Sequence, residues 1–174
     1  MPAETFADPA AIHVAPLGAV GEVARRLSAY DLVTLLSPDT DAAALAALTP
    51  RRRLHLTFHD ITAPRDGLIA PNAAMMAALL DFGRARAAPL LIHCWAGVSR
   101  SSAAAYILAC DARPGREREL AAALRENAPF ATPNALMVRL ADDLLKRDGA
   151  MVAAIAAIGR GAEAFEGTPY RLGL

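Results

Sequence analysis

The sequence has only two cysteines, Cys94 and Cys110, among its 174 residues. Two cysteines cannot form the framework of several disulfides that small secreted domains use, so we expect a reducing compartment and a cytoplasmic protein. They also lack the close spacing of a zinc-binding cysteine pair, and the chain has no Walker A loop. We therefore expect no metal, no cofactor and no nucleotide-hydrolysing P-loop.

Neither sign of charge is in excess, because 18 Lys and Arg residues balance 18 Asp and Glu residues. A neutral chain has no overall field that would attract nucleic acid or a membrane surface, so we expect neither as a partner. The longest apolar run, Met151 to Ile158, is far too short to span a bilayer. The first residues contain acids and prolines where a signal peptide needs basic and apolar runs.

The chain is rich in alanine, which favours helices. Short apolar or alternating runs predict strands, and apolar residues at helical spacing predict helices between them. This order predicts an α/β fold with a central, mostly parallel sheet flanked by helices, and a helical C-terminal part. We expect one domain over 1–174, with 1–10 and 160–174 as loose termini; Pro16 suggests an edge position for the first strand. The predicted strands are 12–17, 31–36, 53–58 and 89–92, and the predicted helices are 18–30, 41–48, 71–87, a helix from 101, 116–127, 134–147 and 149–158.

The stretch from Leu91 to Leu108 carries the most specific signal. It reads as a buried strand, a tight loop with Gly97 and an Ala-rich helix. In such a unit the loop N–H groups and the helix N-terminus converge on one point, which suits a phosphate group. Cys94 lies at the mouth of this cradle, where N–H donors and an arginine favour a nucleophilic thiolate. Arg100 offers a planar fork of donors that can grip two phosphate oxygens.

These residues resemble the active-site signature of the cysteine-dependent protein tyrosine phosphatase superfamily, His-Cys-x5-Arg-Ser/Thr. The small size suggests the compact dual-specificity-type branch. The resemblance implies that Cys94 is the nucleophile and that Arg100 binds the phosphate. Ser101 would stabilise the leaving sulfur, and His93 would fix the loop by a hydrogen bond. The phosphate loop would consist of Trp95, Ala96, Gly97, Val98, Ser99 and Arg100.

A phosphate monoester also needs an acid that protonates the leaving oxygen. Asp60 follows the strand 53–58 and therefore lies at the same edge of the sheet as Cys94. Its separation from the cysteine is similar to that of the family's general acid, so the resemblance points to Asp60. Asp66 on the same loop is the alternative. Either aspartate could also be an ordinary turn former.

The predicted function is hydrolysis of a phosphate monoester through a phosphocysteine, by a protein tyrosine or dual-specificity phosphatase. The partner is then a phosphorylated protein or a small phosphate monoester; phosphotyrosine is the first choice, and phosphoserine/threonine, lipid, nucleotide and RNA phosphates stay open. Two alternatives are a rhodanese-like or arsenate-reductase-like cysteine-loop enzyme and a non-catalytic phospho-binding module. The plainest interpretation makes Cys94 a small buried hydrophobe, but it leaves the joint pattern unexplained.

Three smaller features allow two interpretations each. Trp95 either shapes the rim of the pocket or packs beneath the loop. His59 either contacts the leaving group or is simply exposed. The basic run 51–53 either is a solvated strand entry or binds an acidic partner.

Overall fold

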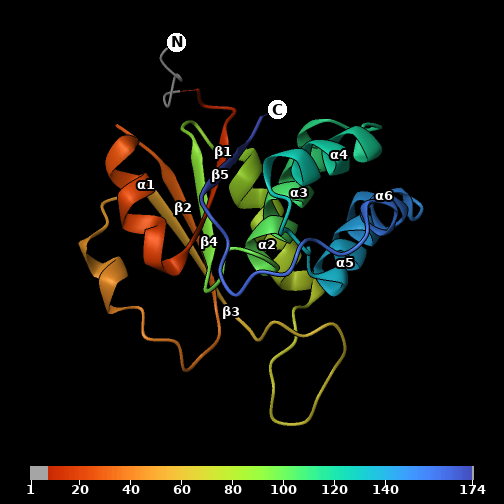
Figure 1. Cartoon of the computed structure of the whole chain (residues 1–174), viewed down its shortest axis with the longest axis horizontal. Coiled ribbons are helices and arrows are strands. Elements are labelled where there is room, and N and C mark those ends of the chain that lie inside the picture. The colour runs from red at the N-terminus through yellow and green to blue at the C-terminus, as the bar shows by residue number, and fades with distance from the viewer. Residues whose placement is uncertain (1–7, 174) are drawn as a thin grey trace.

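The computed structural model describes residues 8–173 and shows one α/β unit built on a five-stranded sheet (Figure 1). The strand order is β3-β2-β4-β1-β5. β1, β2, β3 and β4 run parallel, whereas β5 pairs antiparallel with β1. The predicted α/β architecture with a mostly parallel sheet is confirmed. The strands are β1 (Ile12–Pro16), β2 (Asp31–Leu36), β3 (Arg52–Thr57), β4 (Leu90–Cys94) and β5 (Tyr170–Leu172).

Helices cover both faces of the sheet, with α1 on one face and the remaining helices on the other (Figure 1). Consecutive side chains of β4 divide between these faces, as the period of two in a strand requires. Leu91 packs in the cluster with α1, whereas Leu90 and Ile92 pack in the larger cluster beneath α2 and α3. The helices are α1 (Val20–Arg26), α2 (Ala73–Arg84), α3 (Arg100–Ala112), α4 (Glu117–Asn127), α5 (Ala135–Leu145) and α6 (Ala150–Ile158).

Helix α3 is the central helix, and every residue from Arg100 to Cys110 is buried. Its many alanines allow neighbouring elements to approach closely, and α2, α4, α5 and β4 all pack against it. Gly83 on α2 marks one such approach, because a Cβ there would lie 2.5 Å from the Leu108 side chain. The residues that begin α3 are therefore held in place from several directions.

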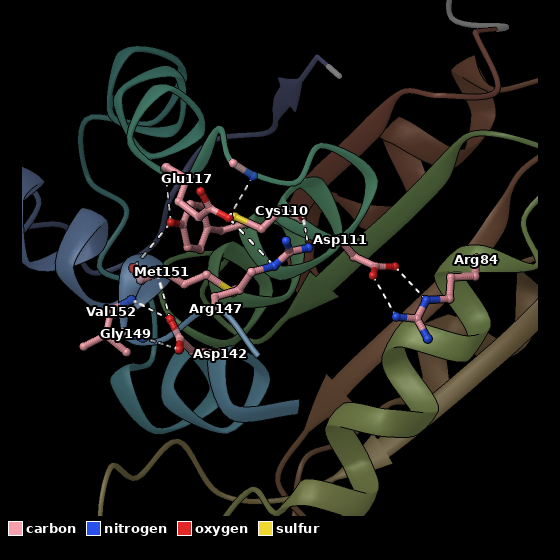
Figure 2. A network of polar contacts seen from close by, with 11 residues as sticks. Arg84, Cys110, Asp111, Glu117, Asp142, Arg147, Gly149, Met151 and Val152 are labelled. Carbon is pink, nitrogen blue, oxygen red and sulfur yellow. Dashed lines mark hydrogen bonds and ion pairs between the residues drawn. The ribbon is translucent and has the colours of Figure 1, made fainter. Parts of the chain in front are cut away.

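A buried polar network ties α3 to the C-terminal helices (Figure 2). The Asp142 carboxylate on α5 accepts the N–H groups of Gly149 at 2.7 Å and Met151 at 2.8 Å, at the start of α6. The Arg147 guanidinium reaches the Cys110 carbonyl at 3.4 Å and lies 3.8 Å from the Glu117 carboxylate. These contacts satisfy helix-end groups that would otherwise be buried without partners.

Three expectations need correction. β1 is an interior strand, because β5 pairs with its first three residues while Pro16 lies beyond that pairing. The expected loose tail 160–174 contains β5, which the antiparallel partner β1 orders. The short helix expected at 41–48 is a 3-10 helix, η2 (Ala43–Ala47); a second, η1 (Leu17–Ala19), precedes α1. Most of the expected loose N-terminus 1–10 lies outside the described residues.

Within residues 8–173, no helix has the length and apolar character needed to cross a membrane.

Candidate active site

The loop between β4 and α3 forms the centre of the candidate site. β4 ends at Cys94 and α3 begins at Arg100, so five loop residues turn between them. This turn lies at the carboxyl ends of the parallel strands, where ligands bind in sheets of this type. The structure thus places the predicted phosphate loop at the expected edge.

The carbonyl groups of this loop are bonded to the surrounding protein. Four of them accept backbone N–H groups from other segments: Trp95 from Leu17 (3.0 Å), Ala96 from Gly167 (2.8 Å), Val98 from Thr132 (3.0 Å) and Ser99 from Asn134 (3.3 Å). Within the described chain, the N–H groups of these same four loop residues donate to no protein acceptor. With the carbonyls bonded outward, the loop keeps its donors for an anion.

Gly97 makes this turn possible. Its φ is 71°, in the left-handed region that favours glycine. A Cβ at this position would also lie 2.8 Å from the Pro16 nitrogen. The Gly97 N–H lies 3.3 Å from the Cys94 sulfur, so the turn aims this donor at the sulfur.

Cys94 lies at the base of the cradle and is 2% exposed. Its Sγ is 3.2 Å from the Ser101 hydroxyl, the first-turn residue of α3 that the sequence singles out. Together with the Gly97 N–H, this hydroxyl can donate to a thiolate. The sulfur therefore has two donors directed at it from the protein.

Arg100 is held so that part of its guanidinium stays available. Its Nη1 donates to the Phe58 carbonyl at 2.9 Å and to the Ser37 hydroxyl at 3.1 Å. Its buried Nε has no hydrogen-bond partner among the described residues. A buried donor without a partner costs free energy, and an oxyanion at the cradle would supply one. The side chain is only 6% exposed, so its fork is fixed before any ligand arrives.

His93 is buried behind the loop. Its Nδ1 lies 3.4 Å from the Cys94 carbonyl, and its Nε2 lies 2.9 Å from the Thr34 hydroxyl on β2. Because a carbonyl only accepts, this geometry puts the proton on Nδ1 and lets Thr34 donate to Nε2. Burial lowers the pKa of His93 from 6.5 to about 4, so the ring is neutral at pH 7. It fixes the loop without adding charge.

Asp60 lies beside the phosphate loop. Its Oδ1 accepts the Ser99 hydroxyl at 2.8 Å and the Asn134 amide at 2.8 Å. Asp60 is a solvent-exposed residue. Asp66, the alternative acid, is also exposed, but no interaction links it to the phosphate loop.

Three residues around the site were not predicted. Asn134 caps α5 by accepting the Met137 N–H and holds both Asp60 and the Ile61 carbonyl. Thr34 lies on β2, and Ser37 directly follows that strand. The sequence shows Asn134 only as a helix start after Pro133. For the two hydroxyls it offers no signal, since their role depends on how β2 pairs with β4.

The structure shows the surroundings of Trp95, His59 and the basic run 51–53, each of which allowed two interpretations. The Trp95 side chain is 41% exposed, so it lies at the rim and not beneath the loop. The His59 ring accepts the Ile69 N–H at 2.9 Å and braces its own loop. Arg52 pairs with Asp31 at 2.8 Å, which ties this residue of the basic run into the fold.

No group of three or more His, Cys, Asp or Glu side chains that could hold a metal ion occurs among residues 8–173. The polar groups at the cradle are N–H, hydroxyl and guanidinium donors, which match an oxyanion in chemical character.

No family model matches the chain, and no curated protein does. The solved structures with a similar fold include two that this chain covers over most of their length. Tk-PTP in its active form superposes with a TM-score of 0.55 at 22% identity, covering 80% of this chain and 99% of the other. The Yvh1 phosphatase domain from Chaetomium thermophilum gives 0.51 at 16% identity, covering 80% and 93%. The chain therefore has the same fold as Tk-PTP and the Yvh1 phosphatase domain.

Proposed function

We propose that this protein hydrolyses phosphate monoesters through a phosphocysteine intermediate, as a protein tyrosine or dual-specificity phosphatase. The observation that carries the proposal is the loop 95–99, in which the Gly97 N–H points at the Cys94 sulfur, the other four N–H groups have no protein acceptor among the described residues, and the buried Nε of Arg100 has no partner there either. A cysteine that merely filled the core would need none of these features. The similar fold of known phosphatases supports the same function.

In the first step the Cys94 thiolate attacks phosphorus, and the bond between phosphorus and the ester oxygen breaks. The loop N–H groups and Arg100 hold the three remaining oxygens as their charge shifts in the transition state. Asp60 gives its proton to the departing oxygen, so an alcohol or phenol leaves. The products of this step are the released alcohol and a phosphocysteine.

In the second step a water molecule attacks the phosphocysteine. The Asp60 carboxylate accepts a proton from that water, the sulfur–phosphorus bond breaks, and inorganic phosphate forms. The Ser101 hydroxyl, 3.2 Å from Sγ, donates to the departing thiolate. The reaction uses only groups on this chain and a water molecule.

The first experiment measures hydrolysis of p-nitrophenyl phosphate without added metal, with wild type beside Cys94→Ser. We expect Cys94→Ser to abolish turnover while phosphopeptide binding persists, since the cradle is intact. Cys110→Ala is the matched control and should remain active. Cys110 is fully buried, and burial raises the pKa of its thiol to about 12, so it is no nucleophile.

Turnover retained in Cys94→Ser would contradict the covalent mechanism. If wild type is also inactive, the cysteine-loop alternatives are tested next. Thiosulfate sulfurtransfer would indicate a rhodanese-like enzyme, and tight phosphopeptide binding with negligible turnover would indicate a phospho-binding module. Neither alternative requires the acid at Asp60.

A further inference from the structure

The most exposed large hydrophobic residue described is Phe165, with 84% of its surface exposed. It lies in the segment 159–169 that joins α6 to β5, which we call the C-terminal tail. The Phe165 ring meets the Trp95 ring edge to face, with centroids 5.3 Å apart and planes at 87°. A residue from the far end of the sequence therefore contacts the first residue of the phosphate loop.

The tail is held firmly on both sides of Phe165. Before it, the Gly161 N–H donates to the Thr132 hydroxyl at 3.1 Å. After it, the Gly167 N–H donates to the Ala96 carbonyl of the phosphate loop at 2.8 Å. Both glycines pack so closely against Phe130 that a Cβ at either position would clash with it. Figure 1 shows the tail returning from α6 past the end of β4 to β5.

The ring pair of Trp95 and Phe165 lies where the organic group of a bound phosphate ester would lie. Three phosphate oxygens face the loop donors, and the ester oxygen must point away from Cys94 for in-line attack. The organic group then emerges at the rim of the cradle, where Trp95 is 41% exposed. The two rings expose apolar surface to water at this place. Covering that surface with another apolar ring is therefore favourable.

We propose that the C-terminal tail supplies one wall of the substrate site, and that Phe165 with Trp95 selects phosphate esters whose organic group is an aromatic ring. The inference rests on the proposed function, because it places the ester at the Cys94 cradle. Phe165 acts as a specificity-determining residue and takes no part in the chemistry. Phosphoserine, which has no ring, would gain little from this wall.

Trp95 is the only tryptophan of the chain and therefore reports on this rim by its fluorescence. The experiment titrates the protein with phenylphosphonate and methylphosphonate, which carry the same anionic group and cannot be hydrolysed. We expect wild type to bind phenylphosphonate more tightly. Phe165→Ala should lower that affinity about three- to tenfold and leave the affinity for methylphosphonate within about twofold. Phe165→Tyr, which keeps the ring, should restore the preference.

Val152→Ala is the matched control, because it removes an exposed aliphatic side chain from α6 and should change neither affinity. Equal affinity for the two phosphonates in wild type would overturn the inference, as would a Phe165→Ala variant with an unchanged ratio. In both cases the proposed function would stand. If a folded protein binds neither phosphonate nor inorganic phosphate, the cradle itself and the proposed function fail together with the inference.

Discussion

Replacing Asp60 by asparagine separates acid catalysis from structure. Asp60 Oδ1 accepts both the Ser99 hydroxyl and the Asn134 amide. The amide oxygen of Asp60→Asn can accept the same two hydrogen bonds, so the geometry persists while the proton is lost. Asp60→Ala would also remove these two bonds. At about 0.5–1.5 kcal/mol each, their loss would lower stability by about 1–3 kcal/mol and add a structural effect to the loss of the proton.

Loss of a general acid costs about 10²- to 10⁴-fold, equivalent to about 2.7–5.5 kcal/mol. We therefore expect kcat of Asp60→Asn to fall by about this factor on an alkyl phosphate, whose leaving group needs the proton. On p-nitrophenyl phosphate, which releases a stable anion, the fall should be much smaller. The assay measures kcat for both substrates in wild type and variant.

Asp66→Asn is the matched control on the same loop, and it should leave both rates unchanged. The assignment is wrong if Asp66→Asn produces the leaving-group-dependent fall. An equal loss on both substrates in Asp60→Asn would refute the reasoning differently, because it would mean that Asp60 only supports the loop.

Three further predictions concern the architecture behind the site. Gly97→Ala should lower the free energy of unfolding by about 1–3 kcal/mol and reduce turnover, because a φ of 71° is strained for alanine. An unchanged free energy of unfolding in urea together with an unchanged kcat would contradict this loop geometry. His93 should lower the free energy of unfolding by about 2 kcal/mol between pH 7 and pH 5. The reason is that its ring takes up a proton below about pH 6.5 in the unfolded chain but only below about pH 4 in the folded chain. Urea unfolding of His93→Gln should lack this part of the slope, and an identical pH dependence would exclude His93 as its source. Asp142→Ala should cost about 1–3 kcal/mol of stability by uncapping α6, with kcat unchanged for the folded fraction; a loss of kcat would mean that the network in Figure 2 supports the site directly.

Local patterns determined much of the architecture. The alternation of strands and helices predicts the parallel sheet, because such crossovers place helices on both faces. The buried run before Cys94 and the alanines after Arg100 predict the strand, loop and helix that the structure shows. This strand, loop and helix predict a phosphate cradle, because loop N–H groups and a helix N-terminus converge on one point, and the spacing of Cys94 and Arg100 resembles a known phosphatase signature.

Contacts between distant segments could only come from the tertiary structure. Nothing near Thr34 or Asn134 marks them as partners of His93 and Asp60, because hydrogen bonds across 59 and 74 residues depend on how the elements pack. The tail looked loose because its glycines and its one proline, Pro169, disfavour helices and strands. In the fold those glycines are what allow it to approach Phe130, and β1 provides the partner for β5. The residues of the proposed cradle could therefore be identified from the sequence, whereas the contact of Phe165 with Trp95 depends on strand pairing at the opposite end of the chain.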